Sequence, residues 1–211
     1  MQNCQMEDLT IMELIYQEHS FQLNKQTNVE IIIEKIHEIL EDGVFFSHLI
    51  IDGKEVYEDF EIYLLDHLTQ IKQIKVITKT VGEFINELLL TAEGYLDRAI
   101  PEVSLLSNEF YQNSSTEGWN KFSQMLEGIQ WLNQMIHTIN KIKEQPNNWN
   151  EYLNLSKKLE NEIKNLEVAV ENDDNVLIAD IIQYEILSIF ERVKSVIQTT
   201  IDLEGCRHDL N

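Results

Sequence analysis

Residues 48–56, HLIIDGKEV, are the most informative segment for the fold of the first third of the chain. Apolar residues lie on both sides of Asp52-Gly53, a dipeptide that favours the tight turn of a β-hairpin. The segment therefore predicts one strand that ends at Ile51 and a second, short strand at 54–56. Leu49 and Ile51 are expected to face the core, because successive side chains of a strand point to opposite faces of a sheet.

Three further strands are predicted around this hairpin. The run 11–16, IMELIY, and residues 21–23 predict a first hairpin, and 74–77, IKVI, predicts the last strand. The side chains of the first hairpin that alternation places on the core face are Met12, Leu14, Tyr16, Phe21 and Leu23. These segments predict a sheet with one buried face.

A capped helix is predicted between the two hairpins. Thr27 and Glu30 have the spacing of a capping box, in which each side chain accepts from the free backbone N–H of the other residue. The helix is expected to end near Asp42-Gly43, since glycine is common just beyond a helix C-terminus. Its apolar stripe consists of Val29, Ile32, Ile33, Ile36, Ile39 and Leu40. A short helical or irregular passage, 60–68, precedes the last strand.

The order of these elements resembles the ubiquitin-like (β-grasp) family over about a third of the chain. The closest local match is 48–56. The resemblance implies a small, non-enzymatic recognition domain, and small bacterial ubiquitin-like proteins linked to secretion machinery are one precedent. It does not imply conjugation, because the last strand continues into 78–82 and carries no Gly-Gly end.

The rest of the chain predicts four long helices. Capping patterns at Thr80, Ser114 and Asn148 and the polar run 171–175 mark four helix starts, and an apolar pattern with spacings of three and four follows each. The expected helices are 81–112, 115–144, 149–171 and 175–204. Pro101 is expected to kink or split the first. Short loops favour an antiparallel up-and-down bundle.

The predicted fold class is therefore α+β. A ubiquitin-like β-grasp domain is expected at 9–79, an antiparallel four-helix bundle at 80–205, and a flexible tail at 206–211. Cys4 and Cys206 have no metal-binding or disulfide spacing, so free thiols in the cytoplasm are expected. No signal peptide or membrane-spanning run is predicted, and no membrane partner.

The net charge of the chain restricts the kinds of partner that we expect it to bind. The chain has 16 Lys+Arg and 37 Asp+Glu, a net charge of −21. Residues 1–80 carry 6 basic and 15 acidic groups, and residues 81–211 carry 10 and 22, so both parts are acidic. Such a field repels nucleic acid and favours a basic protein segment or cations. A simpler interpretation is that acidic helix faces keep the protein in solution.

Catalytic and metal motifs are sparse, and no cofactor is expected. Di-iron bundles need repeated Glu-x-x-His pairs, yet Glu34 and His37 give the only such spacing and Gln134 stands three residues before His137. The acidic run 171–175 lacks the glycine and final glutamate of a calcium loop and is interpreted as a helix cap. The alternative function left open is a carboxylate-based metal-binding or hydrolytic enzyme with a site at the domain junction.

One apolar row on the second long helix is a candidate partner-binding surface. Gly128, Trp131 and Met135 recur at spacings of three and four, beside the core stripe that runs from Phe122 to Ile139. Tryptophan is enriched at the centres of protein interfaces. The alternative is that the row packs against the N-terminal part or widens the core stripe.

These observations predict a non-enzymatic interaction or adaptor protein, chaperone-like or linked to secretion. Its expected partner is a protein that offers a basic or helical segment. Broad apolar seams also pair across two-fold axes, so a homodimer is compatible with the prediction.

Overall fold

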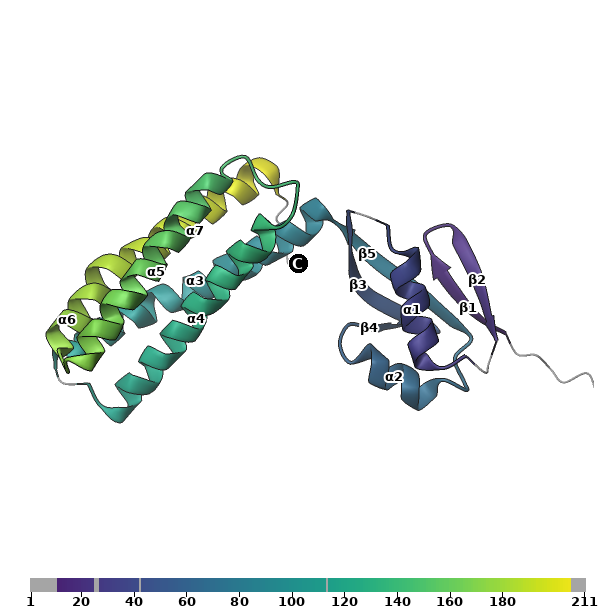
Figure 1. The fold of residues 1–211 in the computed structure, drawn as a ribbon, viewed down its shortest axis with the longest axis horizontal. Coiled ribbons are helices and arrows are strands. Elements are labelled where there is room, and N and C mark those ends of the chain that lie inside the picture. The colour runs from purple at the N-terminus through teal and green to yellow at the C-terminus, as the bar shows by residue number, and fades with distance from the viewer. Residues whose placement is uncertain (1–10, 25–26, 42, 113, 206–211) are drawn as a thin grey trace, which may run out of the picture. The chain divides into compact units, whose positions relative to one another are not determined.

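The structure is a computed structural model that describes residues 11–24, 27–41, 43–112 and 114–205. The chain divides into two compact units, Met1–Val81 and Gly82–Asn211, which we call the sheet unit and the helical unit. The sheet unit holds one mixed sheet and the helical unit is entirely helical where it is described, so the protein is α+β as predicted (Figure 1). The tail predicted at 206–211 lies outside the described residues, as do Cys4 and Cys206.

Five strands form the sheet. They are β1 (Ile11–Tyr16), β2 (His19–Asn24), β3 (Val44–Ile51), β4 (Lys54–Val56) and β5 (Gln73–Thr80). Their order is β2-β1-β5-β3-β4, with β1 and β5 parallel and the other neighbours antiparallel. The strand that comes last in the sequence therefore lies in the middle of the sheet, and every predicted strand segment lies within an observed one.

Two helices belong to the sheet unit, α1 (Val29–Ile39) and α2 (Phe60–His67). Figure 1 shows α1 lying across one face of the sheet. The core between them is a cluster of twelve buried side chains: Met12, Leu14, Tyr16, Ile32, Ile36, Leu49, Ile51, Val56, Leu64, Ile71, Ile74 and Val76. Alternation along the strands predicted the core face correctly, because a strand that is buried on one face presents every second residue to it.

The Asp52-Gly53 turn has the predicted geometry. Both residues have positive φ, 48° and 87°, as the tight turns of two-residue hairpins require. The carboxylate of Asp52 also accepts from the backbone N–H groups of Lys72 and Gln73, the latter at 2.8 Å. The turn is thereby fixed to the start of β5.

Two predicted helix caps lie one residue from the observed ones. α1 is capped by Asn28, whose side chain accepts from the Ile31 N–H at 2.9 Å, whereas Thr27 is buried and bonds Asn24. The second long helix is capped by Ser115 and not by Ser114. In both cases two adjacent residues have capping side chains, and the capping-box spacing selected the wrong one.

The helical unit contains α3 (Val81–Tyr111), α4 (Thr116–Asn140), α5 (Trp149–Glu171) and a last helical stretch. That stretch consists of α6 (Asn175–Asp180), the π-helical segment η1 (Ile181–Ile186) and α7 (Leu187–Glu204). The third predicted helix matches α5, while the second ends at Asn140 and stops short of residue 144. The π-helical segment was not predicted.

Pro101 does not split α3, which runs through it as one helix. Proline removes one backbone donor and leaves the carbonyl four residues earlier, that of Asp97, without its helical partner. Both residues are exposed, so this carbonyl lies on the side of the helix that faces solvent. None of the helices in the described part of the chain is long and apolar enough to cross a bilayer.

Candidate binding groove between α3 and α4

The predicted row on α4 is mostly buried. Met135 is 4% exposed and Gly128 is buried, whereas Trp131 is 37% exposed. The core stripe beside them, from Phe122 to Ile139, is buried as predicted. The buried face of α4 is therefore wider than one stripe, which is the alternative that the sequence left open, and Trp131 alone of the three residues reaches the surface.

Gly128 has no side chain and so leaves a notch on the surface of α4, which a tyrosine of α3 fills. A Cβ at Gly128 would lie 1.6 Å from the hydroxyl of Tyr95, so any side chain there would displace the ring. The ring centroid of Tyr95 lies 5.8 Å from that of Trp131 and 6.5 Å from that of Phe190. The half-buried Tyr95 and the exposed Trp131 together form an aromatic surface beside the notch, and burial raises the pKa of the Tyr95 hydroxyl.

A cavity of about 350 Å³ opens between α3 and α4 next to this aromatic pair. Tyr95 forms part of its wall, and its apolar lining is Ala99, Val103, Leu106 and Met125. Its volume is at the lower end of the range for ligand pockets. We refer to the cavity together with Tyr95 and Trp131 as the α3/α4 groove.

Polar side chains surround the mouth of the groove. Arg98, Glu102 and Gln124 are exposed, and Lys121 is half-buried. The Lys121 ammonium lies 2.6 Å from the carboxylate of Glu109, and this hydrogen bond is the main reason that the pKa of Lys121 is raised. Arg98 makes no ion pair with any residue that the structure describes. An apolar floor with a polar mouth is the usual composition of a recognition pocket.

The residues considered for metal chemistry do not come together. Glu34 and His37 are exposed on α1, and His137 of α4 lies 3.7 Å from Glu160 of α5. Across residues 11–24, 27–41, 43–112 and 114–205, no three His, Cys, Asp or Glu side chains are grouped as a metal ion would require. The acidic run 171–175 caps a helix as predicted, since the Asp174 carboxylate accepts from the Leu177 N–H.

The α3 side of this groove was not predicted from the sequence. Tyr95 and Ala99 belong to the apolar pattern of the predicted helix 81–112, whose residues are expected to face the core, yet both are only half-buried. A signal was present, because a glycine inside a helical pattern often marks a close approach of another element. Gly128 therefore pointed to a neighbour, although its sequence position does not say which residue fills the notch.

A known protein family matches the part of the chain that forms this groove. The family described as Domain of unknown function (DUF8042) matches residues 87–196, just over half of the chain. The chain belongs to this family. The DUF8042 region contains every residue that lines the groove, and the sheet lies outside it. No curated protein and no solved structure matches the chain.

Proposed function

We propose that the protein is a non-enzymatic adaptor whose α3/α4 groove binds a helical segment of a partner protein. In this proposal the sheet unit is a ubiquitin-like β-grasp module and the helical unit is an antiparallel four-helix bundle. The cavity beside Tyr95 and Trp131 is the observation that carries the proposal.

The strand order β2-β1-β5-β3-β4, with a helix across one face, supports the β-grasp assignment. α3 begins at Val81, directly after β5 ends at Thr80, so the module continues into the bundle. The cytoplasm is the proposed compartment, on the argument that cysteines without a spacing motif are typical of a reducing environment.

The shape of the groove favours a helical ligand. An amphipathic helix binds by inserting apolar side chains, three or four residues apart, between two helices of its receptor. The cavity has room for one such anchor, and the Tyr95–Trp131 surface provides an aromatic contact for the next. Arg98, which has no ion pair among the described residues, is available to an acidic or amide group of the partner.

The proposal is tested by filling the cavity. Ala99→Phe places a ring in the groove without removing a buried contact, and Asn108→Phe adds the same ring at an exposed position of α3 outside the cavity. A photo-reactive residue at position 124, on the groove mouth, is used to cross-link partners in the host cell. We expect a specific protein to be cross-linked in the native background and with Asn108→Phe, and lost with Ala99→Phe.

Trp131→Ala, checked for folding by circular dichroism, is expected to lose the same cross-link. Retention of the partner by the folded Ala99→Phe and Trp131→Ala variants would contradict the groove as the binding site. Absence of any cross-linked protein from position 124 would contradict the adaptor function itself.

A further inference from the structure

A second apolar surface lies at the end of the helical unit formed by α6. Tyr184 is 65% exposed, Val176 58%, and Tyr111 and Leu177 41% each. Together with Asp180 we call these residues the tyrosine patch. Isolated exposed apolar residues are normal, but here three lie close together in the sequence of α6 and η1, and the hydroxyl of the fourth, Tyr111, bonds to α6. Groups of exposed apolar residues often mark interaction sites.

Contacts between side chains hold the patch together. The Tyr111 hydroxyl at the end of α3 donates to the carboxylate of Asp180 in α6. The pKa of Tyr111 is raised, chiefly by this hydrogen bond and also by the nearby Tyr184. Val176, Asp180 and Tyr184 follow one another at intervals of four residues, which places them on one side of α6 and η1.

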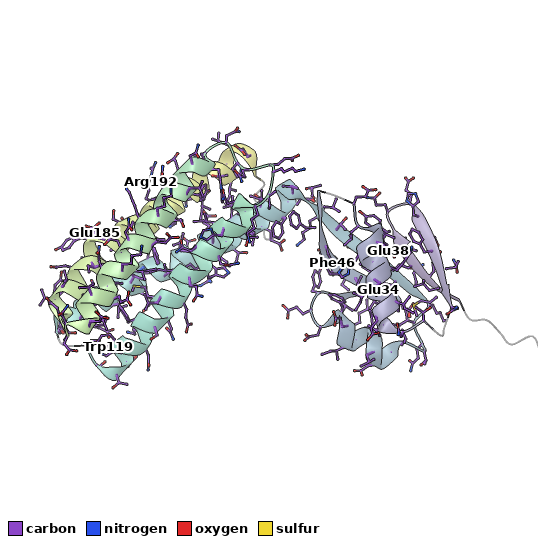
Figure 2. The ribbon with its side chains drawn as sticks, viewed as in Figure 1. Glu34, Glu38, Phe46, Trp119, Glu185 and Arg192 are labelled. Atoms are coloured by element: carbon purple, nitrogen blue, oxygen red, sulfur yellow. The ribbon has the colours of Figure 1, made fainter. Side chains whose placement is uncertain are left out.

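The π-helical segment fixes the outward position of Tyr184. The residue before it, Gln183, accepts from the hydroxyl of Ser107, a fully buried residue of α3, at 2.6 Å. A π-helical turn changes which residues face the core, and such segments occur often at functional sites. Gln183 therefore anchors η1 inward, while Tyr184 is exposed. Its exposed neighbour Glu185 is labelled in Figure 2. The patch is preorganised, which lowers the entropic cost of binding.

The negative charge around the patch determines the sign of the charge that a partner needs. Residues 165–191, which include α6 and η1, contain no Lys, Arg or His. They contain seven carboxylates: Glu167, Glu171, Asp173, Asp174, Asp180, Glu185 and Glu191. An anionic ligand is repelled at such a surface, and so is a second copy of a chain with net charge −21.

We propose that the tyrosine patch docks a cationic amphipathic helix of a partner protein. The apolar side of that helix packs on Val176, Leu177 and Tyr184, and its Lys or Arg residues lie against Asp180 and over the tyrosine rings. Cations are attracted both to carboxylates and to the faces of aromatic rings. This surface is separate from the α3/α4 groove and does not depend on it.

Three synthetic peptides and the full-length protein test the proposal. The first peptide is a helix of about 18 residues, five turns, with leucine on one side and lysine and arginine on the other. The second keeps the leucines and carries glutamate in place of the basic residues. The third has the composition of the first in an order that has no apolar side. Binding is measured by fluorescence anisotropy at two salt concentrations.

We expect the first peptide to bind, and its affinity to fall at high salt because screening weakens exposed charge pairs. The glutamate peptide should not bind, and the scrambled peptide should bind at least tenfold more weakly than the first. Tyr184→Ala, which changes no charge, should weaken binding about tenfold or more, as loss of an interface tyrosine commonly does. Tyr57→Ala removes an equally exposed tyrosine from the sheet unit and should have no effect.

Equal binding of the scrambled peptide, or equal binding to the Tyr184→Ala protein, would overturn the proposal in favour of unspecific attraction to an acidic chain. Failure of the first peptide to bind would also overturn it. Ala99→Phe fills the α3/α4 groove and should leave this affinity unchanged, so the two proposed surfaces can fail independently.

Discussion

The two units differ in how their interiors use polar groups. In the sheet unit, the buried polar residues bond to near neighbours in the sequence, Thr27 to Asn24 and His48 to Ser47. The helical unit buries hydroxyls that bond between helices. Thr200 of α7 lies 2.6 Å from the Tyr152 hydroxyl of α5, and Ser107 of α3 lies 2.6 Å from Gln183 of η1.

This difference fits how strongly the apolar pattern of each unit specifies the packing of its strands or helices. In a sheet, a shift of one residue turns every apolar side chain outward, so alternation strongly restricts the register. A helix with a broad apolar face can rotate or slide at little cost. Buried polar pairs penalise such shifts, because a hydrogen-bonding group that loses its partner in the interior is costly. We infer that the polar pairs set the register of the helical unit.

Removing one of these pairs is the strongest test of that comparison. Thr200→Val keeps the shape of the side chain but leaves the buried Tyr152 hydroxyl and the side chain of Asn148 without their partner. We expect a loss of about 3 kcal/mol in the free energy of unfolding, the upper end for unsatisfied buried groups. Urea denaturation followed by circular dichroism measures it.

Thr199→Val is the matched control. Thr199 is the preceding residue of α7, is exposed, and bonds only within its own helix, to the carbonyl of Ser195. Its substitution should change stability by no more than about 0.5 kcal/mol. Both threonine hydroxyls also donate to the carbonyl four residues back in α7. Equal effects at 199 and 200 would mean that loss of this shared bond, and not of the bond to α5, explains the result.

The notch at Gly128 allows a second test, of whether the contact with Tyr95 aligns α3 with α4. Gly128→Ala gains helix propensity of about 1 kcal/mol but displaces Tyr95. In the native background we expect a net loss of stability, and in a Tyr95→Ala background a gain. The coupling between the two substitutions should be about 2 kcal/mol in a double-mutant cycle measured by urea denaturation.

Gly94 provides the control for this cycle. A Cβ at Gly94 has only an ordinary contact, 3.9 Å to Arg98, so Gly94→Ala should stabilise α3 by about 1 kcal/mol in either background. An equal gain from Gly128→Ala in the native background would show that Tyr95 moves aside freely, and the notch would then have no role in aligning α3 with α4.

The sequence predicted the α+β class and most of the strands and helices because its strongest patterns are local. Alternation at Met12, Leu14 and Tyr16 identified the core face of the sheet, and α5 was predicted with both its ends. The groove could not be predicted in the same way. It depends on which α3 residue meets Gly128, and spacing along one helix carries no information about its neighbour.

A pattern in the sequence indicates the π-helical segment, although the segment was not predicted from it. Ile178, Ile182, Ile186 and Phe190 are all buried and follow one another at intervals of four. At 3.6 residues per turn, three such steps in succession would carry the stripe about a third of the way around an α-helix. A wider turn restores the alignment, and the Leu187 N–H accordingly bonds the Ile182 carbonyl, five residues back.

The smallest expected effect concerns the start of α4, where the observed N-cap lies one residue after the predicted one. The Ser115 hydroxyl accepts from the Gly118 N–H, whereas the Ser114 hydroxyl donates to a neighbouring carbonyl. Ser115→Ala should therefore cost about 1 kcal/mol, the usual value for an N-cap, and Ser114→Ala clearly less. The free energies of unfolding of the two variants, compared under the same conditions, measure the difference. A larger loss at 114 would restore the capping box with Glu117 that the sequence predicted, because that box requires the cap at 114.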